Sequence, residues 1–331
     1  MIAQLDKKYI RLRPSKAISR LVCYGLFEGR PLTTRGRWIN PFVFAHFAVE
    51  KRIPALRKVD RPIYILGTGR SGTTVLGMVL SMHRECAFLN EPKALWHMIH
   101  PAEDLIGSYS LTDASYRLGT ADVDQERRQT AHRLYGACLS ATFSRRIVDK
   151  YPELIFRVPF VMGLFDDAQF VFLIRNGWDT CSSIEKWSER LGQNVSGDTH
   201  DWWGINRRKW KLLVDQIVPE HADLAPYLEE IKEFTSHIDM AAVEWIVTMR
   251  EGIALKERYP DRVHVVRFEE MSRDPDRILR NLEEELGLAH DPVFESYGAS
   301  TLHPVVPAKP EALHCVIAAP FMDMMRKLGY A

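Results

Sequence analysis

The chain has 331 residues, of which 46% are apolar and 26% are charged, and its formal net charge is +1. A chain of this size and composition can bury a full core, and one α/β domain with insertions is its simplest partition. The near-zero net charge gives no global field that would attract nucleic acid, and no apolar run approaches the ~20 residues that a membrane-spanning helix needs.

Residues 1–60 begin with a basic run and continue with short apolar stretches at 21–27 and 42–49. The basic residues are Lys7, Lys8, Arg11, Arg13, Lys16 and Arg20. A basic amphipathic start can lie on an anionic membrane surface, or it can pack on the domain or on a second subunit. We expect residues 1–60 to be an extension that packs on a core domain at 61–331, with peripheral membrane contact and a homo-oligomer left open.

Residues 63–74, with the sequence IYILGTGRSGTT, form an apolar strand, a glycine-rich turn and the start of a helix. Glycines let the backbone turn tightly and approach an anion, and the first N–H groups of a helix have no intrahelical partner. The segment therefore predicts a phosphate-binding loop. Compared with the nucleotide-triphosphate form G-x-x-x-x-G-K-[ST], Thr73 replaces the lysine and the cation has moved to Arg70.

Glu91 follows a short strand-like run at 86–90 and precedes Pro92, which favours an extended or turn conformation at Glu91. This carboxylate is a candidate site residue, and the family resemblance given below implies that it is the first choice for a general base. The rivals are His83, His97 and His100. His83 ends the helix that follows the loop, where a cation is favourable.

A second candidate anion site begins after the apolar strand at 169–174, which has the β-branched and aromatic character of a strand buried on both faces. Arg175 stands at the strand end, followed by an Asn-Gly turn signal, and Ser183 lies eight residues later on the first turns of a helix. A planar guanidinium can donate two parallel hydrogen bonds to a phosphate. We expect Arg175 and Ser183 to hold a second phosphate.

Strands are expected at 63–66, 86–90, 153–157, 169–174 and 263–268. Helices are expected at 73–83, 124–144, 178–190, 202–218, 239–258 and 275–286. Residues 101–148 and 190–245 should be mostly helical insertions that cover the bound substrate. Asp274 fits the N-cap of the last helix, and Gly287 fits its stop. The alternation predicts an α/β fold with a central parallel sheet flanked by helices.

These segments together resemble the sulfotransferases that use 3′-phosphoadenosine-5′-phosphosulfate (PAPS). The Arg-Ser-Gly-Thr-Thr run at 70–74 is similar to the 5′-phosphosulfate loop of the carbohydrate and tyrosyl-protein branch and its bacterial relatives. Arg175 with Ser183 resembles the family's 3′-phosphate motif, and Asp149-Lys150-Tyr151-Pro152 stands where the family usually has Glu-Lys-Thr-Pro. The strand at 263–268 with its Asp-Pro helix also matches, so the resemblance covers roughly residues 60 to 331.

The resemblance implies a P-loop-type sheet and transfer of a sulfuryl group from PAPS to a hydroxyl of a glycan, a glycolipid or another small molecule. Arg70 would stabilise the leaving phosphate, and Glu91 stands where that branch has its catalytic glutamate. The residues expected to bind the donor are Gly69, Arg70, Ser71, Gly72, Thr73, Thr74, Arg175 and Ser183. No divalent metal is expected to be required.

Lys150 and four tryptophans have open roles. Lys150 can face the acceptor or be a solvated lysine. Trp187, Trp202, Trp203 and Trp210 flank a loop-like stretch and can form an acceptor wall or simply pack.

Two other functions stay open at this point. A P-loop kinase would need the lysine that Thr73 replaces and an aspartate near Mg²⁺, whereas the strand at 169–174 ends in Arg175. A non-catalytic protein that binds PAPS or its product would use the same two motifs but would not need Glu91. Five singly placed cysteines and no recognisable signal peptide favour a cytoplasmic protein.

Overall fold

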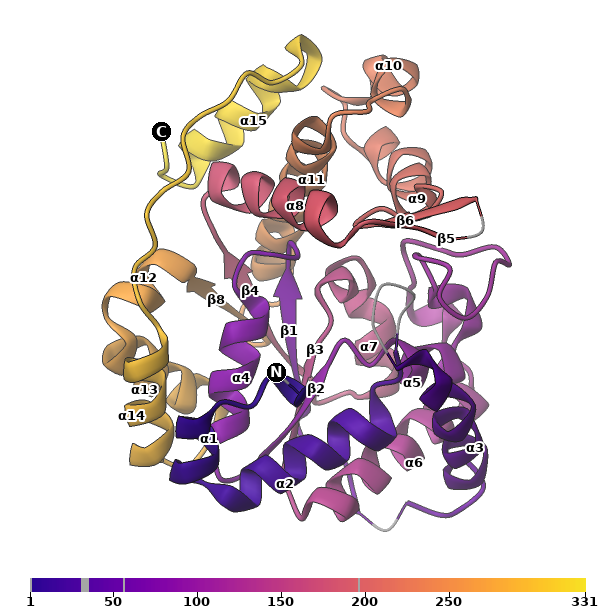
Figure 1. The fold of residues 1–331 in the computed structure, drawn as a ribbon, viewed down its shortest axis with the longest axis vertical. Coiled ribbons are helices and arrows are strands. Elements are labelled where there is room, and N and C mark those ends of the chain that lie inside the picture. Colours follow the sequence, from indigo (N-terminus) through magenta and orange to yellow (C-terminus); the bar gives the residue numbers. More distant parts are fainter. Residues whose placement is uncertain (1, 31–35, 56, 196) are drawn as a thin grey trace.

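The computed structural model describes residues 2–30, 36–55, 57–195 and 197–331. Its centre is a five-stranded, wholly parallel sheet flanked by helices (Figure 1). The strand order is β2-β3-β1-β4-β8, with β1 at Ile63–Gly67, β2 at Cys86–Asn90, β3 at Arg146–Lys150, β4 at Gln169–Ile174 and β8 at Val263–Arg267. This is the α/β architecture that the alternating pattern predicted.

Helices cover both faces of the sheet because the strands alternate their buried side chains between two cores. Ile63 and Ile65 of β1 face α4 (Thr73–Met82), α13 (Pro275–Leu286) and α14 (Pro292–Thr301). Tyr64 and Leu66 face the opposite core. The helices of that second core include α5 (Lys93–Ile99), α6 (Gln125–Thr142), α7 (Val158–Leu164), α8 (Gly177–Leu191), α11 (His237–Arg258) and α15 (Cys315–Lys327).

The carboxyl ends of the central strands meet at one edge of the sheet. The register pairs Gly67 of β1 with Leu173 of β4, and Asn90 of β2 with Lys150 of β3. Strand β1 lies between β3 and β4. Open α/β sheets bind their ligands outside the carboxyl end of a strand in such a position. The segments after β1, β2, β3 and β4 are therefore brought together.

One predicted strand is wrong. Residues 153–157 form no strand but part of the 3₁₀ helix η6 (Pro152–Arg157), and the sheet is instead completed by β3 at Arg146–Lys150. Pro152 stands in the first turn of η6, where its missing N–H costs nothing. The guanidinium of Arg157 is buried and donates to the carbonyl of Ser115 at 2.8 Å, so it stabilises a turn instead of a ladder.

The expectation of mostly helical insertions was also only partly correct. The chain after α8 forms a small antiparallel sheet, β5 (Gln193–Val195), β6 (Asp198–Asp201) and β7 (Gly204–Ile205), and α9 covers only Arg208–Gln216. Residues 101–124 contain two short 3₁₀ helices, η4 (Pro101–Glu103) and η5 (Thr120–Asp122). Both segments lie near the carboxyl edge of the central sheet and approach each other, since Ile205 N–H donates to the carbonyl of Ile106 at 3.1 Å.

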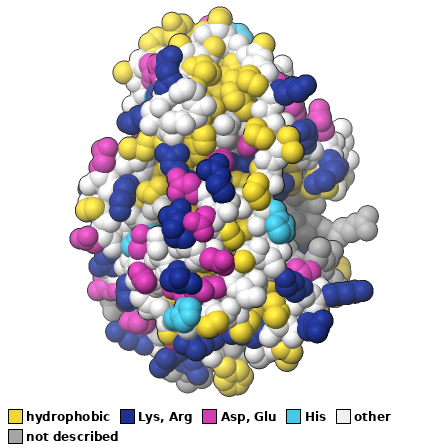
Figure 2. Space-filling view, turned by 90° about the vertical axis from the view of Figure 1, so that its left-hand side faces the viewer, with side chains coloured by type: hydrophobic (Ala, Val, Ile, Leu, Met, Phe, Trp, Pro, Cys, Tyr) yellow, Lys and Arg dark blue, Asp and Glu magenta, His cyan; other side chains and the backbone are white. Residues whose placement is uncertain are grey.

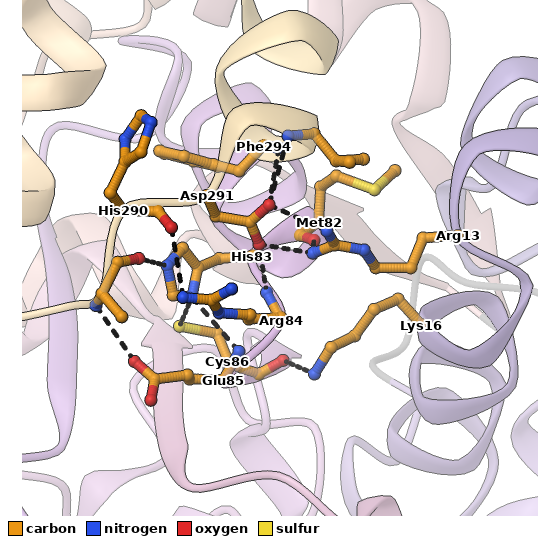
Figure 3. A network of polar contacts seen from close by, with 12 residues as sticks. Arg13, Lys16, Met82, His83, Arg84, Glu85, Cys86, His290, Asp291 and Phe294 are labelled. Atoms are coloured by element: carbon orange, nitrogen blue, oxygen red, sulfur yellow. Dashed lines mark hydrogen bonds and ion pairs between the residues drawn. The ribbon is translucent and has the colours of Figure 1, made fainter.

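The described residues before position 51 include η1 (Ile2–Gln4), α1 (Lys7–Leu12), α2 (Pro14–Val22), η2 (Cys23–Phe27), η3 (Arg37–Ile39) and α3 (Asn40–Glu50). Much of the basic run points into the protein: Lys16 and Arg20 are buried, and Arg13 donates to both oxygens of Asp291 at 2.5 and 2.8 Å (Figure 3). Lys16 donates to the carbonyl of Cys86 at 2.9 Å. The positions left exposed are Lys7, Lys8 and Arg11.

The side of the molecule that carries α13 and α14 has positive and negative side chains interspersed (Figure 2). This agrees with the balanced composition and shows no single-sign field on that face. Among the described residues, no helix is both long enough and apolar enough to cross a bilayer.

Candidate active site

The loop between β1 and α4 has the backbone of an anion cradle. Gly67, Arg70 and Gly72 adopt positive φ values of 141°, 68° and 101°. A Cβ at Gly67 would lie 2.7 Å from the carbonyl oxygen of Leu173, and one at Gly72 would lie 2.4 Å from the ring of Phe268. Glycine is therefore required at both positions, and the turn leads into α4, whose first N–H groups have no intrahelical partner and can bind an anion.

The two predicted phosphate motifs contact each other directly. Arg70 Nε donates to Ser183 Oγ at 3.2 Å, and Arg175 Nη1 donates to the carbonyl oxygen of Arg70 at 2.9 Å. The Arg175 guanidinium also stacks 4.6 Å from the ring centroid of Phe268. Both motifs open into one cleft of about 420 Å³, lined by Gln4, Asp6, Arg70, Gly72, Thr73, Thr74, Val75, Met78, Arg175, Ser183, Phe268, Tyr297 and Thr301.

Within the described part of the chain, Ser71 Oγ of the loop and Arg175 Nε at the end of β4 lack a hydrogen-bond partner. Burial lowers the pKa of Arg70, and the nearby Arg190 lowers it further. Burial also lowers the pKa of Arg175. Clustered cations with unused donors are the arrangement that a polyanionic ligand would satisfy.

Glu91 lies directly after β2, with φ +49° and its N–H bonded to the carbonyl of Lys150 at 2.7 Å. Its carboxylate pairs with the ammonium group of Lys150 and lies 3.7 Å from that of Lys93. The side chain is 36% exposed, whereas that of Lys150 is only 3% exposed. Burial alone would raise the pKa of Glu91, but Lys150 and then Lys93 outweigh it and hold that pKa below its ordinary value.

The N-terminal extension braces the end of β2 next to this carboxylate. Arg20 donates to Glu28 Oε1 at 2.5 Å, and the same oxygen accepts the N–H of Asn90 at 2.7 Å. Both members of this ion pair are buried. The backbone that carries Glu91 is thereby held from both sides, by β3 and by the extension.

Buried ion pairs continue from Glu91 along the wall of a second cavity. Lys93 lies 3.8 Å from Glu153, which lies 3.4 Å from Lys209, and Lys209 lies 2.6 Å from Glu244. Burial opposes ionisation of Glu153, but Lys93 and Lys209 outweigh it and lower its pKa to about 2. Every lysine in this chain of contacts therefore has a carboxylate partner.

The second cavity, of about 80 Å³, also reaches the loop after β1. Gly69 lines this cavity, while its neighbour Arg70 lines the cleft. The complete lining is Gly69, Glu91, Lys93, Ile106, Pro152, Glu153, Trp187, His200, Asp201, Trp202, Gly204, Ile205 and Lys209. A group bound here would face Glu91 on one side and the loop on the other.

The four tryptophans divide into two pairs. Trp187 and Trp202 line the second cavity, with ring centroids 5.4 Å apart and nearly perpendicular planes. Trp202 packs on Gly69, where a Cβ would lie 2.3 Å from the indole, and its Nε1 donates to Glu244 at 2.8 Å. Trp203 and Trp210 are buried in the core, so the packing interpretation holds for that pair, and the acceptor wall stays a prediction for Trp187 and Trp202.

The rival histidines lie elsewhere. His83 is buried and bonds the carbonyl of Ala289 at 2.8 Å. His97 borders a different cavity, beside Trp38 and Tyr109, and His100 packs on Phe160. None of the three lines the cavity that contains Glu91.

The structure brings most of the predicted donor-site residues together in the cleft: Arg70, Gly72, Thr73, Thr74, Arg175 and Ser183. Ser71 is a buried residue of the loop that does not line the cleft, and Gly69 lines the second cavity instead. The sequence analysis missed Phe268, Lys93, Glu153 and Lys209. Phe268 stood in a motif already noted, but the lysines and glutamates carry no local signal because their partners are distant in sequence.

Known proteins share features with this chain. The model described as "Sulfotransferase family" matches residues 62–226. The nodulation protein NoeE of Sinorhizobium fredii is 28% identical over 133 residues, which are 37% of this chain and 30% of that protein. The matched part thus spans less than a third of this curated relative.

Solved structures that this chain matches include a sulfotransferase domain from the curacin biosynthetic pathway, at 14% identity and a TM-score of 0.48, covering 83% of this chain and 99% of that one. Another is a mouse sulfotransferase, SULT7A1, complexed with PAP, at 14% identity and a TM-score of 0.37, covering 82% of this chain and 76% of that one.

Proposed function

The chain belongs to the sulfotransferase family over residues 62–226, and from that premise we propose that it transfers a sulfuryl group from PAPS to a hydroxyl oxygen. One observation carries the proposal. Two basic motifs, 105 residues apart at Arg70 and Arg175, meet at a hydrogen bond and open into one cleft of about 420 Å³. A donor with phosphates at its 3′ and 5′ positions is the ligand that two such sites fit.

The residues of the cleft suit this donor. The loop N–H groups, Arg70 and Thr74 would hold the 5′-phosphosulfate end, and Arg175 with Ser183 would hold the 3′-phosphate. The unused donors at Ser71 and Arg175 support this fit. When bound, PAPS supplies an activated sulfuryl group, and Arg70 would stabilise the negative charge that develops on the leaving phosphate.

The transfer forms a bond from the acceptor oxygen to sulfur and breaks the bond from sulfur to the bridging oxygen, whose electron pair stays with the phosphate. The proton of the acceptor hydroxyl must leave, and we assign it to the carboxylate of Glu91. The lowered pKa keeps this carboxylate ionised at neutral pH. Lys150 orients it by an ion pair from the end of β3.

The second cavity is the proposed acceptor site because it joins Glu91 to the phosphate loop through Gly69. Its lysines are already neutralised by glutamates, so it offers no spare cation for an acidic acceptor. The perpendicular pair of Trp187 and Trp202 gives a stacking surface. These features favour an uncharged hydroxylated acceptor, such as a neutral glycan, a glycolipid or a small alcohol.

Transfer of labelled sulfate from PAPS to a panel of neutral glycosides and alcohols tests the proposal. We expect product with the wild-type protein and almost none with Glu91→Gln. A non-catalytic PAP-binding protein is the alternative, and it would bind PAP yet give no product with any acceptor. A P-loop kinase is disfavoured by Thr73 in place of lysine and would instead turn over ATP with Mg²⁺.

We propose further that transfer needs no divalent metal, so that a chelator leaves the rate unchanged, and that the enzyme works in the cytoplasm. Peripheral membrane contact and a homo-oligomer also stay proposals. With Lys16 and Arg20 buried, the charge available for membrane contact comes from Lys7, Lys8 and Arg11. Flotation with anionic vesicles tests the membrane contact, and light scattering tests the homo-oligomer.

A further inference from the structure

The donor cleft is completed by the first residues of the chain, far in sequence from both phosphate motifs. Gln4 and Asp6 line the same cleft as Arg70 and Arg175. In Figure 1 the N-terminus lies beside α4, the helix that the phosphate loop opens. The sequence analysis treated this segment only as an extension outside the donor site.

The segment is held in place by specific contacts. Asp6 caps α1 by accepting the N–H of Tyr9 at 2.6 Å, and its other oxygen accepts the hydroxyl of Tyr297 at 3.3 Å. The Tyr9 hydroxyl bonds Ser81 of α4, 2.9 Å from its Oγ. Residues 4–6 are thus positioned between α4 and α14, both of which also line the cleft.

Gln4 has two features that packing alone does not require. Its φ is +61°, following +52° at Ala3, and both are left-handed conformations that cost energy for a residue with a side chain. Its Oε1 is buried, with no hydrogen-bond partner in the described part of the chain. An unsatisfied buried amide oxygen at a binding cleft calls for a donor from the ligand.

The chemistry of the donor nucleotide limits which group this can be. Phosphate oxygens only accept hydrogen bonds, as does the oxygen of Gln4, and the carboxylate of Asp6 would repel them. The nucleoside offers two kinds of donor, the exocyclic amine of adenine and the ribose 2′-hydroxyl. Glutamine is also able to pair with adenine at two atoms at once, through the amine and a ring nitrogen.

We propose that Gln4 recognises the adenine amine, so that the N-terminal segment sets the base specificity of the nucleotide site. This inference rests on the proposed function, since it takes the cleft to be the PAPS site. It adds that the extension is part of the ligand-binding machinery and not only a packing element.

The test is a cycle of protein and ligand changes followed by calorimetry. Gln4→Met keeps the length of the side chain but removes its amide. The ligands are PAP, the inosine analogue that replaces the amine with a carbonyl, and 2′-deoxy-PAP. The control variant is Lys8→Ala, an exposed position on α1 that does not line the cleft.

We expect wild-type protein to bind PAP about tenfold more tightly than the inosine analogue, which is typical of one well-placed hydrogen bond. Gln4→Met should bind PAP about tenfold more weakly and should no longer distinguish the two bases, with an unchanged melting temperature. Lys8→Ala should behave as wild type.

Two results would overturn the inference while leaving the proposed function intact: equal base preference in wild type and Gln4→Met, or a loss of discrimination only against 2′-deoxy-PAP. Failure of the wild-type protein to bind PAP at all would instead refute the proposed function, and this inference with it.

Discussion

Asp149 provides a prediction in which the magnitude follows from the structure. This carboxyl group is fully buried in β3, next to Lys150, and its Oδ2 accepts from Trp96 at 2.9 Å and from Tyr135 at 2.5 Å. Its Oδ1 has no partner in the described part of the chain. Burial raises the pKa of Asp149 from the ordinary 3.8 to about 7, although the hydrogen bonds from Tyr135 and Trp96 oppose the shift.

A raised carboxyl pKa makes stability fall as pH rises. Between pH 4 and pH 7 the folded protein keeps a proton on Asp149 that the unfolded chain has released, so the unfolding free energy decreases over this range and is level above it. A shift of about 3 units at ~1.4 kcal/mol each corresponds to roughly 4 kcal/mol. Asparagine has no such titration, and its carbonyl oxygen can take over the hydrogen bonds from Trp96 and Tyr135.

The assay is urea unfolding of wild type and Asp149→Asn from pH 4.5 to pH 8, at constant ionic strength. We expect the variant to gain stability relative to wild type as pH rises, by a few kcal/mol across the range, because only wild type titrates at position 149. Other groups, such as Glu103, whose pKa burial raises to about 7, titrate in both proteins and cancel in the difference. Asp166→Asn, at an exposed position, is the control and should give a flat difference. Parallel curves for Asp149→Asn and wild type would refute the reasoning.

Three further predictions concern the proposed active site. Glu91→Gln should lower kcat by about 10²–10⁴-fold while leaving PAP affinity within about twofold, and a kcat near that of wild type would remove Glu91 from the mechanism. Gly69→Ala should displace Trp202, whose indole would lie 2.3 Å from the new Cβ, and should raise the acceptor KM several-fold. Gly119→Ala, where a Cβ meets nothing within 4 Å, should leave KM unchanged, and equal effects of the two glycine variants would contradict the placement of the acceptor. Glu153→Gln should free lysine charge in the second cavity and shift the kcat/KM ratio toward a glucuronide over the matching glucoside; an unchanged ratio would mean that the cavity does not contact that part of the acceptor.

The phosphate loop and most of the sheet could be predicted because their signals are local. Glycines at 67 and 72 are needed for a turn whose geometry depends on a few adjacent residues, and β1 and β4 are continuous apolar runs. The strand end at Arg175 is similarly marked by its Asn-Gly turn. Local chemistry therefore indicated both halves of the proposed donor cleft, and the parallel sheet brought them together.

The parts that the sequence did not predict depend on partners distant in the chain. In β3 the residues Arg146, Asp149 and Lys150 look solvated, but all three are buried and find their partners elsewhere. Arg13 belongs to an apparent basic strip, yet its carboxylate partner is 278 residues away. Periodicity and propensity carry no information about such pairs, so the wrong strand at 153–157 and the missed lysine–glutamate contacts have the same cause.

The central claim is that one nucleotide spans the two motifs, and calorimetry tests it most directly. Wild-type protein should bind PAP with micromolar affinity and without metal, and ATP should bind little with or without Mg²⁺. Arg175→Ala should weaken PAP binding by about 10–100-fold, as expected for charged hydrogen bonds to a phosphate, and should abolish the preference over ATP. Tighter binding of Mg²⁺-ATP than of PAP, or an Arg175→Ala variant with undiminished preference for PAP, would contradict the account.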